Sequence, residues 1–299
     1  MRAMANLDDL LEKTSRTFAV SIPMLPEPTR RHVGLSYLLF RIADTFEDAA
    51  RWPRERRLAA LDELDGLLGR RGGEAAAASR WLDDPPVSHA GYLELLRETP
   101  AVMDVYWTIA APARAAIQRD LRRTVRGMAG FVRRGDERGN LRLRSLRELR
   151  DYCYAVAGIV GEMLTELFLL DADRLASSAP RLRRRSRFFG EALQLVNILK
   201  DSASDATEGR VYLPASVDRA RVFALARRDL AIAAAYVRIL QDAGAPEGFV
   251  AFTGSPAVLA RASLARIESS APGAKLTRAE VASLMERMFD DLAGGRRLL

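Results

Sequence analysis

The chain has 299 residues, of which 48% are hydrophobic and 28% charged, so it can bury a sizeable core and is not globally disordered. Basic residues exceed acidic ones by 46 to 39, a net charge of +7, which suits acidic partners such as nucleic acid, anionic lipid or phosphorylated small molecules, or is simply a solvated basic surface. The single cysteine, Cys153, excludes an intramolecular disulfide and a multi-cysteine metal site.

The sequence also bears on where the protein is expected to work. A lone cysteine fits a reducing cytoplasm. The first residues lack the apolar core of a secretory signal, and no run approaches the roughly 18 apolar residues that a membrane span needs. We therefore expect a cytoplasmic chain with no transmembrane anchor, and peripheral membrane contact stays open.

Apolar residues recur with a period near 3.6 along most of the first half, which predicts helices. Prolines and glycines supply the expected breaks, and Thr29 is the expected cap of the second helix. The helices expected in this half span residues 7–22, 29–50, 54–68, 74–84, 91–109 with a break at Pro100, and 112–134.

The second half continues the pattern after a loop over residues 135–140. Ser145 is the expected N-cap of a helix over residues 146–170, with Glu148 completing a capping box. A helix over residues 181–203 and an irregular stretch over residues 205–214 follow. Two or three further helices are expected from residue 215, with breaks at residues 244–256 and 269–275. No linker divides the chain, so we expect one all-α domain over residues 1–299.

The stretch RIADTFED, residues 41–48, carries an acidic stripe in a helix that is otherwise apolar. Asp44 and Asp48 are four residues apart, which places them on one helix face with about 5–6 Å between Cβ atoms. Tyr37 and Arg41 lie on the same stripe, and Glu47 is beside it. Like charges at this spacing favour a compensating cation. Taken by itself, such a pair is usually solvated surface.

A second stretch, NILKDSASD, changes that interpretation because Asn197, Asp201 and Asp205 recur at intervals of four beside apolar residues. Two acidic stripes in mostly buried helices are costly unless they are paired or bind metal. If they face each other across a bundle, they form an oxygen-only site that suits Mg²⁺ with substrate phosphates. The basic residues expected to neutralise further phosphate oxygens are Arg41, Lys200 and Arg210.

Other cofactor sites lack a matching pattern. His32 and His89 share no zinc-ligand spacing, and neither a G-x-G-x-x-G fingerprint nor a Walker loop occurs. Cys153 has no histidine near it in the sequence, so we interpret it as a buried structural thiol rather than a nucleophile.

Four ordered blocks resemble the squalene and phytoene synthases, helical enzymes that join two prenyl diphosphates head to head. The resemblance extends over roughly residues 10 to 290 and implies an isoprenoid synthase-type helical bundle with a central prenyl-binding cavity. The matching blocks are SRTFAVSIPMLP (15–26), YLLFRIADTFED (37–48), DYCYAVAGIVGEML (151–164) and NILKDSASDATEGRVYLP (197–214).

The resemblance assigns roles to individual residues. It implies that Tyr152, Arg41 and Asp48 take part in the chemistry, and that Lys275 and Arg278 contact NADPH. The metal ligands that it implies are Asp44, Glu47, Asp48, Asp201 and Asp205. The positions that line the diphosphate and prenyl sites are Ser15, Arg16, Phe18, Tyr37, Arg41, Asn197, Lys200 and Arg210.

The implied reaction is the Mg²⁺-dependent condensation of two farnesyl diphosphates, through presqualene diphosphate, to squalene, with reduction by NADPH. An apolar cavity would keep the carbocation from water, and Tyr152 or the released diphosphate would accept the proton. The aromatic residues that we consider for this cavity are Phe18, Tyr37, Phe40, Phe188 and Phe189, each of which is more often plain core.

Details of the motifs bear on the product. Thr45, Glu47 and a loosely matching block over residues 255–285 favour a squalene-forming enzyme over a phytoene-forming one. Lys200 and Ser204 depart from the family's usual arginine and glutamate, which predicts a weaker second metal site.

The alternative functions are a synthase of dehydrosqualene, phytoene or hydroxysqualene that does not reduce its product and, more remotely, a basic helical protein that binds nucleic acid or membrane. We expect prenyl diphosphates and no nucleic acid as partners.

Overall fold

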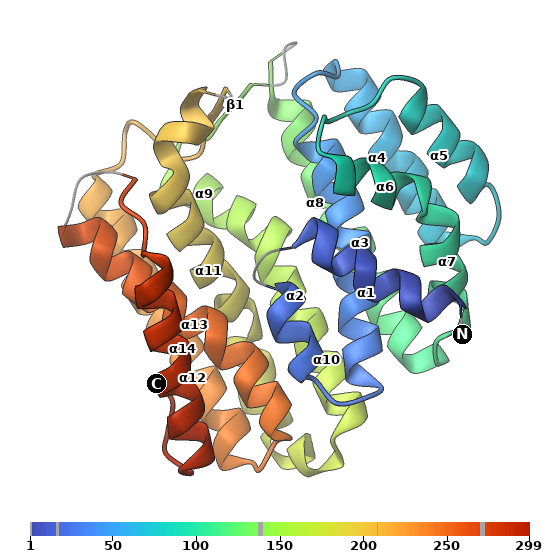
Figure 1. Cartoon of the computed structure of the whole chain (residues 1–299). Helices are drawn as coiled ribbons and strands as arrows, with labels where there is room; N and C mark the ends of the chain where they lie inside the picture. Colours follow the sequence, from blue (N-terminus) through green and yellow to red (C-terminus); the bar gives the residue numbers. More distant parts are fainter. Residues whose placement is uncertain (1, 16–17, 137–139, 208, 270–272) are drawn as a thin grey trace. The chain divides into compact units, whose positions relative to one another are not determined.

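The structure is a computed structural model that describes residues 2–15, 18–136, 140–207, 209–269 and 273–299 (Figure 1). Helices form nearly all of its regular structure, and its only strands among these residues are two of two residues each. The all-α prediction is therefore confirmed. The chain forms two compact units, which we describe separately: residues 1–23 with 27–140, and residues 24–26 with 141–299. The expectation of one domain over residues 1–299 stays a prediction.

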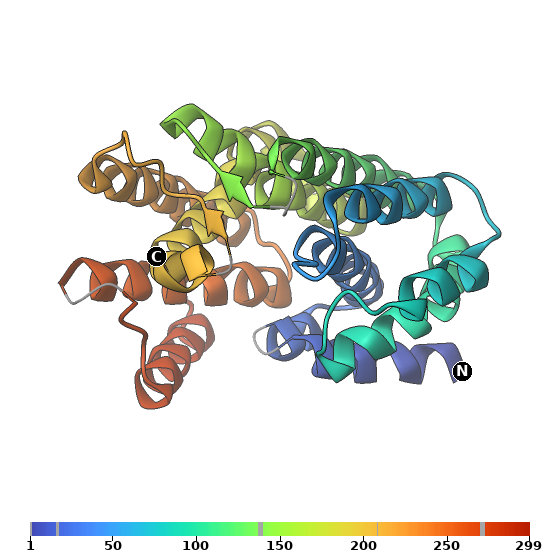
Figure 2. The same cartoon turned by 90° about the horizontal axis from the view of Figure 1, so that it is seen from above.

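The first unit packs around the helix that carries the first acidic stripe. In this helix, α3, Leu38, Leu39 and Phe46 are fully buried, and the Phe46 ring lies 4.7 Å from Trp81 between centroids. The view from above shows α4 running alongside α8 (Figure 2). The helices of this unit are α1 (Arg2–Thr14), α2 (Phe18–Ser21), α3 (Thr29–Glu47), α4 (Arg54–Gly69), α5 (Glu74–Asp83), α6 (Ala90–Arg97), α7 (Thr99–Thr108) and α8 (Ala111–Arg134); the short 3₁₀ turn η1 (Ile22–Met24) follows α2.

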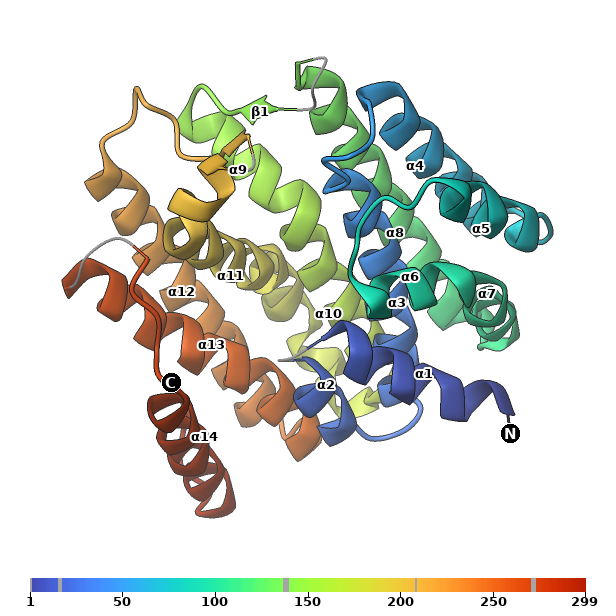
Figure 3. The same cartoon turned by 45° about the horizontal axis from the view of Figure 1, so that its top comes forward.

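The second unit packs around the longest helix, α11, which contacts α9, α10, α12 and α13. α14, which begins at Arg278, contacts α13 at an angle (Figure 3). The elements of this unit are β1 (Leu141–Arg142), α9 (Leu146–Cys153), a π-helical turn η2 (Tyr154–Gly158), α10 (Ile159–Asp171), a 3₁₀ stretch η3 (Asp173–Ser178), α11 (Ala179–Thr207), β2 (Arg210–Val211), α12 (Arg219–Asp242), α13 (Glu247–Ser269) and α14 (Arg278–Ala293).

The two short strands join segments that are far apart in the sequence. β1 and β2 pair in parallel, with Leu141 opposite Arg210 and Arg142 opposite Val211. The backbone N–H of Leu143 continues this pairing, because it donates to the carbonyl oxygen of Val211 at 3.0 Å. The pairing thus holds the segment before α9 next to the segment that follows the second acidic stripe.

Helix α11 lies unusually close to the segment from η2 to α10. A Cβ atom at Gly190 would lie 1.9 Å from the carbonyl oxygen of Ala157, and one at Gly161 would lie 2.1 Å from that of Ser186. Only glycine fits at such distances, so backbone packs directly on backbone here.

Several predicted helix ends are correct and two are wrong. Ser145 caps α9 as predicted and accepts the N–H of Glu148, whose own carboxylate accepts the N–H of Arg144. The predicted cap at Thr29 is wrong, because Pro28 holds that position and Thr29 is already helical. The helix predicted over residues 7–22 is instead two, since Ser15 leaves the helical pattern and its hydroxyl accepts the N–H of Phe18.

The structure also differs from the prediction inside one predicted helix and at one predicted break. The helix predicted over residues 146–170 contains the π-helical turn at Tyr154–Gly158. The break predicted at residues 244–256 is shorter, because α13 begins at Glu247 and carries Pro256 inside it. Residues 137–139 and 270–272 of two predicted loops lie outside the described residues.

One stretch, Leu146–Asp171, is long and apolar enough to cross a membrane by length and composition, which the sequence analysis did not anticipate. Within its most apolar window, 56% of the residues are buried inside the protein. The core helix of a soluble protein has the same features, so the stretch is weak evidence for a membrane span.

Candidate active site

The first acidic stripe lies on the C-terminal half of α3 and already contains a cation. The Arg41 guanidinium lies 3.4 Å from the Asp44 carboxylate and donates to the Tyr37 hydroxyl at 2.9 Å. The same guanidinium lies 5.4 Å from the centroids of the Tyr37 and Tyr92 rings. Arg41 is therefore fixed between an acid and two aromatic rings, with 26% of its side chain exposed.

The charges in this stripe perturb one another. Burial raises the pKa of Asp44 to about 6, Arg41 opposes the rise, and the nearby charge of Asp48 adds to it. Burial also disfavours the charge of Arg41, but Asp44 and Tyr37 more than offset this and raise the pKa of the guanidinium. A second cation beside Asp44 and Asp48 would relieve their repulsion.

The three acids of the stripe differ in accessibility. Asp48 is exposed at the C-terminal end of α3, Asp44 is partly exposed, and Glu47 is buried with 8% of its surface accessible. The backbone carbonyl of Glu47 accepts a hydrogen bond from Arg57 of α4. Asp44 and Asp48 are thus the better placed of the three to meet a ligand from solvent.

The N-terminal block contributes an aromatic wall beside Arg41. The Phe18 and Tyr37 rings lie 5.5 Å apart, and the Tyr37 hydroxyl donates to the carbonyl oxygen of Thr14 at 3.1 Å. The hydroxyl of Ser15 is engaged by the start of α2. Arg16, predicted to line the diphosphate site, lies outside the described residues.

The second acidic stripe lies near the C-terminal end of α11 and is also accompanied by cations. The Lys200 ammonium donates to the Asn197 side-chain oxygen at 2.9 Å and lies 3.3 Å from the Asp201 carboxylate. The other oxygen of Asp201 is 3.5 Å from Lys275, which precedes α14. Lys275 therefore contacts the predicted metal pair, whereas Arg278 is exposed at the start of α14.

The second member of this pair meets the first residue of β2. Asp205 lies 4.0 Å from the guanidinium of Arg210, and both side chains are mostly buried, at 19% and 18% exposure. The short β1–β2 pairing holds Arg210 beside α11. The structure thus brings together the predicted residues Asn197, Lys200, Asp201, Lys275, Asp205 and Arg210 within the second unit.

Tyr152 has a partner that the sequence does not indicate. Its hydroxyl donates to the hydroxyl of Tyr212 at 3.0 Å, and the two rings stack with centroids 4.7 Å apart. Both rings are buried. Tyr212 belongs to the block that carries the second acidic pair, two residues after Arg210, and that proximity was the only signal for it.

The residues considered for the apolar cavity occupy different surroundings. Phe40 and Phe189 are buried, and the Phe189 ring lies 5.5 Å from the Tyr236 ring. Phe188 is half-buried beneath the guanidinium groups of Arg187 and Arg228. The central prenyl-binding cavity itself stays a prediction.

Cys153 is buried with no exposed surface, as predicted for a structural thiol. Burial raises the pKa of its thiol well above the ordinary value, and the charges of Glu191 and Asp229 add to the rise. A thiolate is therefore disfavoured at neutral pH.

Among the residues that the structure describes, no three His, Cys, Asp or Glu side chains are grouped closely enough to hold a metal ion. The donor chemistry nevertheless fits Mg²⁺, which needs only one or two carboxylates and completes its shell with water and phosphate oxygens. On α3 the charge of Asp48 adds to the rise in the pKa of Asp44, a repulsion that a bound cation would relieve. The two aspartate pairs lie in different units, so their facing each other stays a prediction.

Comparisons with known proteins show which family the chain resembles. A family model described as squalene/phytoene synthase matches residues 11–246. The Botryococcus squalene synthase of Botryococcus braunii is 28% identical over 202 residues, 67% of this chain and 39% of the relative. The squalene synthase of Schizosaccharomyces pombe is 29% identical over 212 residues, 70% of this chain and 43% of the relative. The chain thus spans about two fifths of the length of these curated relatives.

Solved structures show the same fold. A structure of TcSQS with the ligand BPH1237 has a TM-score of 0.72 and 24% identity, covering 98% of this chain and 86% of that one. A dehydrosqualene synthase in complex with a ligand has a TM-score of 0.62 and 19% identity, covering 98% of this chain and 97% of that one. The fold is therefore the all-α isoprenoid synthase fold. Since the matched residues 11–246 include both aspartate pairs, Tyr152 and Tyr212, the chain belongs to the squalene/phytoene synthase family.

Proposed function

We propose that the protein is a Mg²⁺-dependent prenyltransferase that joins two prenyl diphosphates head to head, with farnesyl diphosphate as its substrate. The observation that carries this proposal is that the family match over residues 11–246 contains two aspartate pairs, each with lysine or arginine side chains beside it. Carboxylates suit magnesium and guanidinium groups suit phosphate oxygens, so each stripe carries both halves of a diphosphate site.

The basic side chains have a defined task in this reaction. Mg²⁺, held by Asp44, Asp48, Asp201 and Asp205, would supply positive charge to the leaving diphosphate. Arg41, Lys200 and Arg210 bind the remaining phosphate oxygens and stabilise the charge that develops as the allylic C–O bond breaks.

The carbocation that remains must then be kept from water until the double bond of the second substrate attacks it. Phe18 and Tyr37 present aromatic faces beside Arg41, and such faces stabilise a cation. Proton loss then closes a cyclopropane. The Tyr152 hydroxyl, hydrogen-bonded to Tyr212, relays that proton, or the released diphosphate accepts it.

We further propose that the product is squalene, formed through presqualene diphosphate with a hydride from NADPH. Thr45 and Glu47 support this choice through their likeness to the squalene-type motif, and Lys275 and Arg278 would contact the nucleotide. The alternative is a dehydrosqualene, phytoene or hydroxysqualene synthase, which needs no reductant. A cytoplasmic location with peripheral membrane contact is part of the proposal.

The test is incubation with farnesyl or geranylgeranyl diphosphate and Mg²⁺, with and without NADPH, followed by lipid analysis. Squalene formed only with NADPH is the expected result. A product unchanged by NADPH would overturn the reductive half of the proposal. If neither substrate releases diphosphate, the proposal that the protein is a prenyltransferase is overturned.

The variant Asp48→Asn tests the first aspartate pair. It should abolish Mg²⁺-dependent turnover, because it removes the accessible carboxylate of α3, and it should leave any affinity for nucleic acid unchanged or higher. Asp62→Asn is the matched control, since Asp62 is an exposed aspartate of α4 in the same unit. Equal turnover in the two variants would contradict a role for the pair, and nucleic-acid binding without Mg²⁺-dependent turnover in the wild type would favour the nucleic-acid alternative.

A further inference from the structure

A π-helical turn follows directly after the segment that carries Tyr152. α9 ends at Cys153, η2 spans Tyr154–Gly158, and α10 begins at Ile159. A π-helical turn has one residue more than an α-helical turn, so it changes the direction of side chains before it relative to those after it. The orientation of Tyr152 relative to α10 therefore depends on this turn keeping its form.

Helix α11 holds the turn from one side. The backbone of Gly190 lies against Ala157, and the next residue, Glu191, lies over Gly158. A Cβ atom at Gly158 would be 3.2 Å from Cγ of Glu191 and 3.3 Å from its Oε1. The Glu191 side chain has no exposed surface, so its carboxylate is placed directly on the turn.

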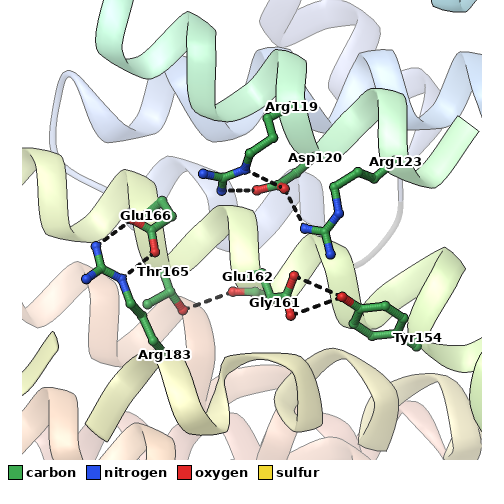
Figure 4. Close-up of polar contacts among 9 residues, drawn as sticks. All are labelled: Arg119, Asp120, Arg123, Tyr154, Gly161, Glu162, Thr165, Glu166 and Arg183. Carbon is green, nitrogen blue, oxygen red and sulfur yellow. Dashed lines mark hydrogen bonds and ion pairs between the residues drawn. The ribbon is translucent and has the colours of Figure 1, made fainter. Parts of the chain in front are cut away.

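A chain of contacts leads from this carboxylate to the first residue of the turn. Glu191 Oε1 accepts a hydrogen bond from Nε of Arg187 at 2.7 Å. The Arg187 guanidinium lies 4.5 Å from the centroid of the Tyr154 ring. The Tyr154 hydroxyl in turn donates to the carboxylate of Glu162 on α10 at 3.3 Å (Figure 4). The ring that opens the turn is thus held by α11 on its face and by α10 at its hydroxyl.

The burial of Glu191 has an energetic cost that packing alone does not offset. Its second oxygen, Oε2, is buried without a hydrogen-bond partner among the described residues, and an unpaired buried polar atom is costly. Burial also raises the pKa of its carboxyl group, which Arg187 opposes and the buried Asp229 of α12 reinforces. Such a cost is retained where a polar contact fixes a geometry that an apolar side chain would not fix.

We propose that Glu191 and Arg187 are positioning residues, which hold the π-helical turn and through it the direction of the Tyr152 side chain toward its reaction partner. The proposal rests on the proposed function, in which Tyr152 handles the proton. Glu191 acts through Arg187 and Tyr154 and touches neither substrate nor the reacting atoms.

A second ion pair on the same two helices supplies a matched control. Arg183, one turn before Arg187 on α11, makes two hydrogen bonds of 2.7 and 2.8 Å to Glu166 of α10 (Figure 4). This pair joins α11 to α10 beyond the turn. Glu166→Gln therefore removes a comparable charge contact without touching Tyr154.

The test compares Glu191→Gln, Arg187→Lys and Glu166→Gln with the wild type, by steady-state diphosphate release and by amide hydrogen exchange. Glu191→Gln should lower kcat about tenfold with KM within twofold, since a small misplacement of a reacting group is costly while substrate contacts remain. Arg187→Lys keeps the charge but loses the guanidinium group that lies over the Tyr154 ring, so it should also lower kcat. Glu191→Gln and Arg187→Lys should also raise amide hydrogen exchange in residues 152–158. Glu166→Gln should change neither kcat nor this exchange.

The outcomes separate this proposal from the proposed function. If the wild type releases no diphosphate, the proposed function fails, and the exchange of residues 152–158 still decides whether Glu191 holds the turn. If the wild type is active and Glu191→Gln matches Glu166→Gln in kcat and in exchange, the positioning role is overturned. A fall in kcat in Glu191→Gln accompanied by an equal fall in Glu166→Gln would overturn it too, because general loosening of α11 would then explain both.

Discussion

At the scale of single residues, the candidate site combines acids that repel one another with cations that hold them. Asp44 and Asp48 lie four residues apart on α3, and Arg41 partly neutralises the first of them. The two carboxylate oxygens of Asp201 on α11 meet different lysines, Lys200 of the same helix and Lys275, which precedes α14. In the proposed function a magnesium diphosphate would bring both charges at once: its phosphates would take over these lysine and arginine contacts, and the carboxylates would hold the metal.

The stacked tyrosines give the first prediction. Tyr152→Phe removes the hydroxyl that donates to Tyr212, so kcat for product formation should fall about a hundredfold if this hydroxyl relays the proton. The stack itself is kept, so KM should change little. Tyr212→Phe should have a smaller effect, and the double variant should match Tyr152→Phe, because the second hydroxyl acts only through the first. Additive losses in kcat would contradict this order of action.

The sequence identified Tyr152 but not its partner. Both tyrosines lie in blocks that resemble the family, but the sequence does not show that these blocks meet, which they do beside the pairing of β1 with β2 across about 70 residues, from Leu141 to Arg210. Nothing in the residues themselves signals a strand pair of two residues each. In the same way the sequence placed Lys275 with the nucleotide, and only the fold shows that it contacts Asp201.

At the scale of helices, charge pairs fasten α4 to α8 in the first unit. Asp65 of α4 accepts two hydrogen bonds, of 2.9 and 2.8 Å, from the guanidinium of Arg122 on α8. On α8 itself the fully buried Asp120 binds both Arg119 and Arg123, which are more exposed (Figure 4). These arginines add positive charge to the surface, and their ion pairs also help the helices to pack.

The pair of Asp65 and Arg122 predicts a pH dependence. The hydrogen bond from Arg122 lowers the pKa of Asp65, so the folded state binds fewer protons than the unfolded state. The stabilisation is therefore complete above the unfolded pKa of about 3.9 and is lost as the pH falls through the folded value. Asp65→Asn should cost about 1–2 kcal/mol at pH 7, measured by urea unfolding, and its difference from the wild type should shrink below pH 4.

Asp8→Asn is the control for this prediction. Asp8 meets Arg30 by one hydrogen bond of 2.8 Å, and 58% of its side chain is exposed. An exposed pair contributes about 0–1 kcal/mol, so this variant should unfold close to the wild type. A pH-independent cost of Asp65→Asn would show that packing of the side chain, not its charge, is what stabilises α4 against α8.

Helix periodicity predicted most helices, and its errors have local causes. The 3.6-residue pattern continues through Tyr154–Gly158, where Ala155 and Gly158 are buried, so the sequence does not signal the π-helical turn, which α11 contacts through Gly190 and Glu191. Pro256 signalled a break, yet α13 passes through it with Gly254, Ser255 and Ala257 buried around it. Tertiary packing outweighs the local preference of proline at that position.

At the scale of the whole molecule, both acidic stripes were predicted from spacing and burial, and each lies on a long helix with basic partners of its own unit. What spacing does not predict is how a stripe in the first unit combines with one in the second. Each stripe has carboxylates and basic side chains of its own, and the combination of the two stripes in one site stays a prediction.

Ligand-induced thermal stabilisation tests this combination with Mg²⁺ and inorganic diphosphate as the probe. At a concentration of 100 times Kd, binding to the folded state contributes about 2.7 kcal/mol, which should raise Tm by roughly 5–10 °C for a chain of this size. If Asp48 and Asp201 serve one site, Asp48→Asn and Asp201→Asn should each remove most of the shift, and the double variant should remove little more. Two independent sites would instead leave each single variant a partial shift, with losses that add in the double variant. Asp62→Asn should keep the full shift, so a general loss of binding from an altered surface charge can be recognised.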